Sequence, residues 1–211
     1  MSVLTALFLM AAPTPVTGVY VAQQRETASA LELEADGRYR WFYSQGALDL
    51  SSEGQWTREG DAVILTSDPV TPPSFVYAGS SATGQAGLLV RVLTAADHPI
   101  PAVDVVLRYR SGKDVAGSTD GDGQKRFDLP AGSDALQHIV LALPVFELRS
   151  QDFKVEPKPG ETLTFRLEAN DLGKQAFARE RLKETKTGLA MSYRGAKLDY
   201  QRQEGEMEEV P

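Results

Sequence analysis

A strict alternation of apolar and charged residues around one glycine is the feature that most constrains what this chain can fold into. The run Leu31–Trp41 reads LELEADGRYRW. A two-residue turn at its centre would set apolar side chains opposite charged ones, whereas a three-residue loop over Ala35–Gly37 sets Leu33 opposite Tyr39. The sequence therefore predicts a β-hairpin with Gly37 in the left-handed conformation and with one apolar face.

The polar face of this hairpin carries charges of opposite sign. In the predicted register Glu34 meets Arg38, and Glu32 meets Arg40. Paired carboxylates can also serve a glycosidase, and such a pair could be drawn from several acidic residues of the first segment: Glu32, Glu34, Asp49, Glu53 and Asp61. The basic partners on the hairpin favour surface ion pairs instead.

A second hairpin is predicted over Gly54–Leu65. A turn at Glu59 and Gly60 would set Trp56 opposite Val63, so that apolar residues again face each other. Turn residues recur at strand spacing on both sides of this segment, which is typical of an all-β protein.

The last third of the chain predicts a helix and a third hairpin. Asn170–Thr187 is rich in charged residues, contains alanine and has a capping residue at its start, which favours a helix. Leu189–Arg202 alternates again, and a turn at Arg194 and Gly195 brings its apolar residues onto one face.

Composition narrows the class of protein. Hydrophobic residues make up 42% of the 211 residues and charged residues 24%, so most of the chain can bury a core. The net charge of −7 disfavours nucleic acid and anionic lipid as partners. The chain has no cysteine, which excludes disulfides, thiol catalysis and thiolate metal sites.

The N-terminus predicts export. Val3–Ala12 is apolar except for Thr5 and precedes a proline-rich stretch. The length of this apolar run suits the hydrophobic region of a signal peptide and is too short to span a bilayer. We therefore expect residues 1–17 to be a signal peptide and the protein to be periplasmic or secreted, with no transmembrane segment. A buried first strand or a misplaced start codon would explain the same run.

Composition also suggests where the domains divide. Gly79–Gly87 is small, polar and glycine-rich, as in a flexible connection. We expect a sandwich of short strands over 87–169, a first domain formed by 18–86 together with 170–203, and a disordered acidic tail at 204–211. The fold class is mostly β.

The middle of the chain resembles a known family of β-sandwiches. Within Val90–Gly132, a strand entered through Pro99 is followed by a TDGDG turn at Thr119–Gly123 and an aromatic strand at Phe127. This order is similar to carboxypeptidase regulatory-like, or transthyretin-like, domains, although three extra residues precede the aromatic one. The resemblance implies a sandwich that acts as a noncatalytic module.

The first segment resembles small bacterial lipocalin-like barrels. The motifs that support this are Asp36–Tyr39 and Gly54–Trp56. Members of these families also end in a hairpin like the one predicted near the C-terminus. The resemblance implies that the sandwich is inserted into a barrel whose last two strands come from the end of the chain.

Metal binding has one candidate. Asp120, Asp122 and Asp128 could offer oxygen ligands to calcium, but Ala131 occupies the position where a helix-flanked calcium loop needs an acid. A plain Asp-Gly turn explains the residues better, and we expect no metal and no cofactor.

Catalysis has weak candidates. His98 and His138 are the two histidines, and neither has a carboxylate or a second histidine at a useful spacing. Ser80, Ser81 and Ser133 lack the context of an activated serine. We expect no enzymatic activity.

Four aromatic residues on inward faces could line a ligand cavity: Tyr39, Trp41, Trp56 and Phe75. A packed core would use the same residues. The sequence therefore predicts a noncatalytic exported β protein that binds a macromolecular or envelope partner, and the alternative is a lipocalin-like carrier of a small apolar ligand.

Overall fold

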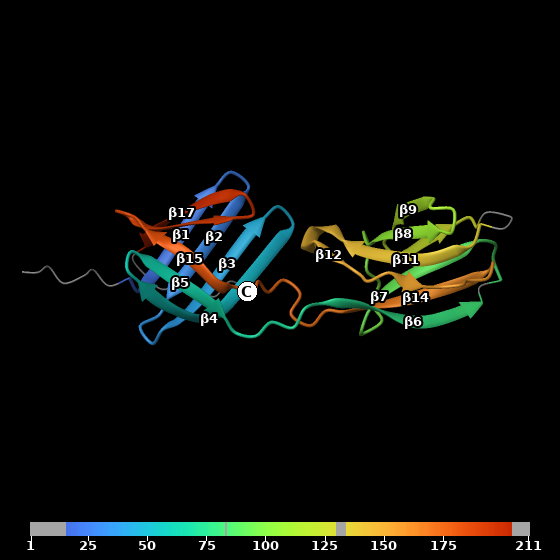
Figure 1. Cartoon of the computed structure of the whole chain (residues 1–211), viewed down its shortest axis with the longest axis horizontal. Helices are drawn as coiled ribbons and strands as arrows, with labels where there is room; N and C mark the ends of the chain where they lie inside the picture. The colour runs from blue at the N-terminus through green and yellow to red at the C-terminus, as the bar shows by residue number, and fades with distance from the viewer. Residues whose placement is uncertain (1–15, 83, 130–133, 204–211) are drawn as a thin grey trace, which may run out of the picture. The chain divides into compact units, whose positions relative to one another are not determined.

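The computed structural model describes residues 16–82, 84–129 and 134–203, and these residues form two compact units (Figure 1). The first unit comprises the chain up to Ser44, Ser51–Asp68 and the chain from Ala176 on. The second comprises Gln45–Leu50 and Pro69–Gln175. The predicted signal peptide, except its last two residues, and the predicted acidic tail lie outside the described residues.

The first unit, completed by the residues of β3 and β4 that fall within Gln45–Leu50, forms a closed eight-stranded barrel with the strand order β1-β17-β16-β15-β5-β4-β3-β2. Its strands are β1 (Gly18–Gln24), β2 (Thr27–Leu33), β3 (Arg38–Gln45), β4 (Leu48–Glu59), β5 (Ala62–Ser67), β15 (Ala178–Glu184), β16 (Gly188–Tyr193) and β17 (Ala196–Gln203). Side chains alternate between the interior and the surface, and closure leaves the barrel no free edge strand. The predicted mostly β fold class is confirmed.

The first hairpin has the predicted loop. Gly37 has a φ of 90°, and the backbone N–H of Glu34 donates to the carbonyl of Arg38 at 2.9 Å. The predicted pair of Glu32 and Arg40 is present at 2.5 Å. The Arg38 guanidinium, however, binds Asp68 at 2.6 Å and not Glu34.

The second hairpin has a different register from the predicted one. Trp56 lies opposite Leu65, and the turn falls at Gly60 and Asp61, with Gly60 at a φ of 64°. Ala62–Leu65 is buried at every position, so no alternation specified the register there. Gly60 fixes the register instead, because the first position of this two-residue turn requires a positive φ.

The third hairpin forms as predicted and closes the barrel. Met191 lies opposite Leu198, and Arg194 and Gly195 have φ angles of 49° and 80°. Strand β17 then pairs with β1. The prediction that this hairpin packs on the first segment is confirmed.

The predicted helix over 170–187 is wrong. Its second half is strand β15, which pairs antiparallel with β5. The charged residues there favour a helix, but Leu182 is fully buried between neighbouring strands. Pairing along β5 overrides the intrinsic preference.

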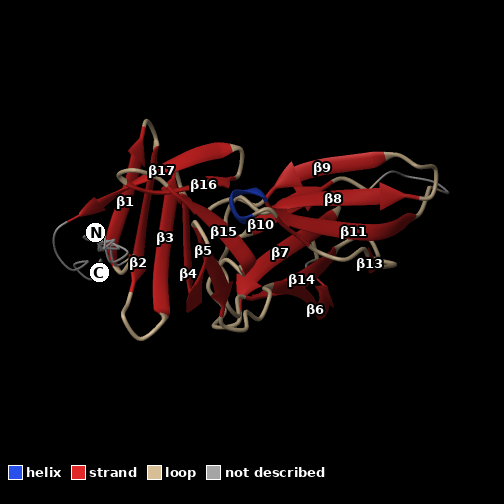
Figure 2. Ribbon diagram, turned by 60° about the vertical axis from the view of Figure 1, so that its left-hand side comes forward, coloured by secondary structure: helices blue, strands red, loops and turns tan. Residues whose placement is uncertain are grey.

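The second unit is a sandwich of two sheets around one apolar core (Figure 2). One sheet contains β10 (Gln124–Phe127), β7 (Leu88–Thr94), β14 (Glu161–Glu168) and β6 (Ser74–Ala82) in that order. The other contains β12 (Leu148–Arg149), β11 (Leu136–Leu143), β8 (Asp104–Tyr109) and β9 (Asp114–Ser118), with β13 (Phe153–Lys154) also paired to β11. A short 3-10 helix, η1 (Pro144–Phe146), precedes β12.

The barrel unit stops earlier than predicted, at Asp68 instead of residue 86, and resumes later, at Ala176 instead of residue 170. Residues 79–82 of the predicted linker belong to β6, which pairs with β14. Backbone pairing needs no large side chain, so a strand rich in glycine and serine was taken for a connection.

The sandwich is inserted between two barrel strands that pair with each other. Thr66 of β5 lies opposite Ala178 of β15. Beyond that pair, the backbone N–H of Ser67 donates to the carbonyl of Phe177 at 2.9 Å. The chain therefore leaves and re-enters the barrel at adjacent positions.

Among the described residues, no helix has the length and hydrophobicity needed to cross a membrane.

Candidate functional site

The barrel interior is built around strand β3. Tyr39, Trp41 and Tyr43 occupy alternate positions of this strand, and each is at most 2% exposed. A period of two puts all three side chains on the inner face. These rings supply much of the interior volume of a barrel of this size.

The polar atoms of these rings bond to one another. The indole N–H of Trp41 donates to the hydroxyl oxygen of Tyr200 at 2.8 Å, and that hydroxyl lies 2.7 Å from Oγ of Ser29. Ser29 in turn donates to the carbonyl of Phe42 at 2.6 Å. Burial raises the pKa of Tyr200 to about 12, so the hydroxyl stays neutral at ordinary pH.

A second buried pair joins β3 to β4. The hydroxyl of Tyr39 lies 2.8 Å from Oγ of Ser52, and burial raises the pKa of Tyr39. Ligand pockets hold a few polar groups that are free to orient a ligand, whereas these hydroxyls already bond to the protein. The arrangement is that of a structural core.

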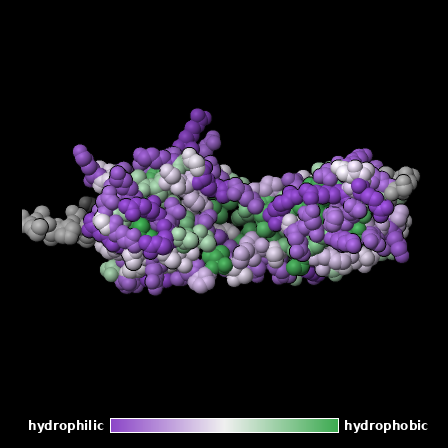
Figure 3. All heavy atoms as spheres, viewed as in Figure 1, coloured by the Kyte–Doolittle hydropathy of each residue, from purple (hydrophilic) through white to green (hydrophobic). Residues whose placement is uncertain are grey.

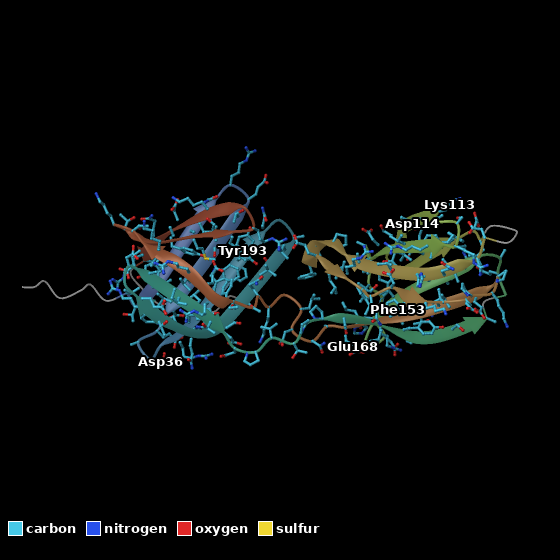
Figure 4. All side chains as sticks on the ribbon, viewed as in Figure 1. Asp36, Lys113, Asp114, Phe153, Glu168 and Tyr193 are labelled. Carbon is cyan, nitrogen blue, oxygen red and sulfur yellow. The ribbon has the colours of Figure 1, made fainter. Side chains whose placement is uncertain are left out.

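Five aromatic rings form a cluster in the barrel. Trp41 and Tyr43 stack with centroids 5.8 Å apart, and Tyr193 lies edge-on to both at 5.1 and 5.0 Å. Phe177 packs edge-on against Trp41 at 5.0 Å, and Tyr39 lies 6.5 Å from Phe177. Tyr193 is labelled on the barrel in Figure 4.

The four residues predicted to line a cavity do not share one site. Tyr39 and Trp41 lie in the barrel interior. Trp56 is only partly buried, and its indole N–H donates to the carbonyl of Glu34 at 2.9 Å. Phe75 belongs to the sandwich core, because its strand pairs with β14 and not with the barrel.

Sequence reasoning missed Tyr43, Phe177 and Tyr193. Tyr43 could have been found, since it continues the alternation of Tyr39 and Trp41. Phe177 fell within the mistaken helix, and only the long-range pairing of the strands brings it to Tyr193.

The edge strand β6 of the sandwich carries two exposed hydrophobic residues. Most of the face seen in Figure 3 is hydrophilic. Val76 and Tyr77 on β6 are nevertheless 37% and 45% exposed. The Tyr77 ring packs on Phe165 at 5.4 Å, and Phe165 packs on Phe153 at 5.0 Å, so the exposed tyrosine continues the core.

Two depressions adjoin the segment 154–157, which begins at the last residue of β13. One of about 280 Å³ is lined by this segment together with Tyr77, Ser80, Glu161 and Leu163. Another of about 480 Å³ is lined by the same segment together with Arg110 and residues 135–138. The exposed Tyr77 therefore borders a hollowed surface that carries charges of both signs.

The candidate metal-binding aspartates Asp120 and Asp122 lie in one turn, and the two histidines lie in other elements. Asp120 stabilises its turn, where one carboxylate oxygen accepts the backbone N–H groups of Asp122 and Gln124 at 3.0 Å each. His98 lies in an exposed loop, and His138 lies in β11 at the larger depression. Within the described ranges, no group of three or more histidine, cysteine or acidic residues could hold a metal ion.

The remaining candidates have structural surroundings. Ser80 and Ser81 lie in β6, and Ser133 lies outside the described residues. Of the acidic residues of the first segment, Glu32 pairs with Arg40, and Asp61 pairs with Arg181 at 3.2 Å.

Comparison with protein-family models, with curated proteins and with solved structures found no match for the chain.

Proposed function

We propose that this chain is a noncatalytic exported protein that binds a protein or envelope partner through its sandwich unit. The observation that supports this most is the edge strand β6, where Val76 and Tyr77 are exposed and Tyr77 lines the smaller of the two depressions. Aromatic side chains that are held by a core yet exposed at their tips are typical anchors of protein interfaces.

Strand addition is the binding mode that this edge favours. β6 has nine residues and carries no charge, and it pairs with β14 on one side. Natural edge strands are usually protected by charges, prolines or bulges, and here a register shift at Ala78 is the one such feature within the strand. An extended segment of a partner would gain backbone hydrogen bonds along β6 and contacts with Val76 and Tyr77.

The carrier alternative has less support. The interior rings Tyr39, Trp41, Tyr43 and Tyr200 are almost completely buried, and the hydroxyls of Tyr39 and Tyr200 bond inside the barrel. A ligand would have to displace these contacts. The barrel thus serves as a scaffold in this proposal, and the sandwich supplies recognition.

We also propose that each unit is related to a known family. The closed barrel and its terminal hairpin support a relationship to lipocalin-like barrels. The two-sheet sandwich and the turn at Thr119–Gly123 support a relationship to carboxypeptidase regulatory-like domains, which the resemblance describes as noncatalytic modules.

The binding proposal is tested by site-directed photocrosslinking in the cell of origin. A photoreactive residue at Val76 should trap a partner, whereas the same residue at Arg40, whose side chain is 50% exposed on the barrel, should not. The trapped protein is then purified and titrated against the wild type and against Val76→Lys with Tyr77→Glu. We expect at least about a tenfold loss of affinity in the double variant. Unchanged affinity would contradict the proposal.

Export is tested separately by cell fractionation. The full chain should be found outside the cytoplasm and begin near residue 18, and deletion of residues 1–17 should retain it in the cytoplasm. A full-length chain that stays in the cytoplasm would contradict export without bearing on the role of β6.

A further inference from the structure

Three neighbouring strands of the sandwich place basic residues side by side on the outer face of one sheet. His138 of β11 lies opposite Arg108 of β8 on one side and opposite Lys154 of β13 on the other. Residues directly opposite each other in antiparallel strands project to the same face, with Cβ atoms about 4.5–5.5 Å apart. The next row across these strands contains Ile139, which is buried in the core, so the basic row faces outward.

A β-bulge in β11 turns His138 toward this outer face. Leu136 and His138 are two residues apart, and in a regular strand they would share a face. Leu136 belongs to the core and lies opposite Tyr109. The register of β11 against β8 shifts between Leu136 and His138, so that the extra residue of the bulge reverses the alternation. His138 therefore joins the basic row instead of the core.

Arg110 continues the basic row at the end of β8. It lies two residues after Arg108, so the period of two gives both arginines the same outward face. The backbone N–H of Arg110 donates to the carbonyl of Ala135 at 2.9 Å, which keeps the two chain segments adjacent at this point. The side chain of Arg110 thus lies on the same side of the sheet as His138.

The basic residues meet at one hollow of the surface. Arg110, His138 and Lys154 all line the larger depression, which has a volume of about 480 Å³. Sites for small molecules occupy about 300–1,000 Å³. Among the described residues that line the depression, Glu156 is the acidic one. Basic side chains therefore outnumber acidic ones here, although the whole chain has a net charge of −7. Phe153, which precedes Lys154 in β13, is labelled in Figure 4.

The chain does not neutralise these basic side chains. Arg108, beside the depression, binds the carboxylate of Asp152 at 2.8 Å. Within the described ranges, by contrast, no ion pair and no side-chain hydrogen bond involves Arg110, His138 or Lys154. Their N–H donors are therefore available to a ligand in the depression.

We propose that the larger depression binds a small organic anion that carries two or more carboxylate or phosphate groups. The guanidinium group of Arg110 offers a planar pair of donors that matches either oxyanion, and the ammonium group of Lys154 offers a second positive charge. The ring of His138 adds an N–H donor between them. A ligand with one oxyanion group would engage one of the two cations, whereas a polyanion engages both. This inference is separate from the proposed function, because it requires no partner strand on β6.

The test is isothermal titration of the full chain with citrate and with glucose 6-phosphate at constant ionic strength. We expect saturable binding of at least one of them, and the comparison shows whether the site prefers carboxylate or phosphate. Acetate, which has a single carboxylate, should bind at least about tenfold more weakly than citrate or glucose 6-phosphate. Binding should weaken as the salt concentration rises, because the attraction is between charges at an exposed surface.

Variants of the lining residues locate the site. Arg110→Gln and Lys154→Gln should each weaken binding by about tenfold, since each removes a charge-assisted hydrogen bond. Glu156→Gln removes the like charge and should strengthen binding by about two- to threefold. The matched control is Arg149→Gln, because Arg149 is an exposed cation of the same sheet that does not line the depression. Its substitution should leave binding unchanged.

Folding of the variants is checked by far-ultraviolet circular dichroism and urea unfolding. Arg110, Lys154 and Glu156 are exposed, so the variants should unfold as the wild type does. The proposal is overturned if neither citrate nor glucose 6-phosphate binds, or if acetate binds as tightly as they do. It is also overturned if the folded Arg110→Gln and Lys154→Gln variants bind as the wild type does, or if Arg149→Gln weakens binding as much as they do.

Discussion

At the scale of single residues, the hydroxyl of Tyr200 is the polar centre of the barrel. It accepts the indole N–H of Trp41 and lies within hydrogen-bond distance of Ser29. Tyr200→Phe would leave the Trp41 donor buried without an acceptor, which costs about 1–3 kcal/mol. We expect the free energy of unfolding to fall by this amount in urea titrations followed by tryptophan fluorescence.

Fluorescence isolates the barrel in this experiment. The chain has two tryptophans, Trp41 and Trp56, and both belong to the barrel unit. Tyr77→Phe in the sandwich is the matched control and should change the transition by less than about 0.5 kcal/mol. Equal effects of the two substitutions would mean that the buried network contributes nothing specific.

The raised pKa of Tyr200 predicts a loss of stability in alkali. The folded pKa is about 12, whereas an unfolded tyrosine titrates near about 10. Between these values the unfolded state binds fewer protons than the folded state. The contribution of Tyr200 to the free energy of unfolding is therefore complete below about pH 10 and is lost as the pH rises toward 12. The total loss is roughly 2–3 kcal/mol. Urea unfolding at pH 9, 10 and 11 should show a steeper decline for the wild type than for Tyr200→Phe, and parallel declines would contradict this assignment.

At the scale of elements, strands β4 and β5 approach so closely that only glycine fits at position 54. A Cβ on Gly54 would lie 2.2 Å from the carbonyl oxygen of Thr66 and 2.6 Å from Cα of Ser67. These are backbone atoms and cannot move aside as a side chain would. Gly54→Ala should therefore destabilise the barrel by roughly 2–3 kcal/mol in the fluorescence assay.

The control for this substitution is Gly121→Ala. A Cβ on Gly121 meets no atom within 4 Å, and the residue does not need a positive φ. We expect no measurable change in stability. A neutral Gly54→Ala would show that β4 and β5 separate more readily than their spacing indicates.

The elements that could be predicted from sequence are those whose own residues fix the geometry. The first and third hairpins follow from alternation and from Gly37 and Gly195, which take positive φ angles in their turns. The second hairpin lacks alternation because β5 is buried at four consecutive positions, and β15 takes its conformation from pairing with β5. The conformational preferences of the residues within a strand carry no information about which strand it pairs with.

The same distinction applies to the candidate sites. The alternation of β3 predicts that Tyr39 and Trp41 face the interior. Phe177 and Tyr193 come together only when β15 and β16 become neighbours. The orientation of His138 depends on the β-bulge next to it, and no residue pattern in the sequence predicts that bulge. Phe75 was predicted to lie in the wrong unit, because the sequence of a strand does not show which strand it pairs with.

At the scale of the whole molecule, the chain is a barrel interrupted by an independent sandwich core. The connecting segments are tied together, since the backbone N–H of Thr71 donates to the carboxylate of Asp171 at 2.8 Å and that of Asp171 donates to the carbonyl of Thr71 at 3.2 Å. The sandwich has its own apolar core on both sheets. An insertion whose ends meet on adjacent strands can be removed without stretching the host fold.

Excision of residues 69–175 should therefore leave a folded barrel. Ser67 and Phe177 face each other across β5 and β15 with a backbone hydrogen bond of 2.9 Å, so an Asn-Gly turn can join Asp68 directly to Ala176. We expect the shortened chain to keep the native tryptophan emission and near-ultraviolet dichroism and to unfold cooperatively in urea. As the control, removing residues 188–203 from the same chain deletes β16 and β17, exposes the edges of β1 and β15, and should abolish that transition. If the excised chain loses its near-ultraviolet signal while the sandwich fragment 69–175 also fails to fold, the two cores depend on each other, and the description of an inserted independent unit is wrong.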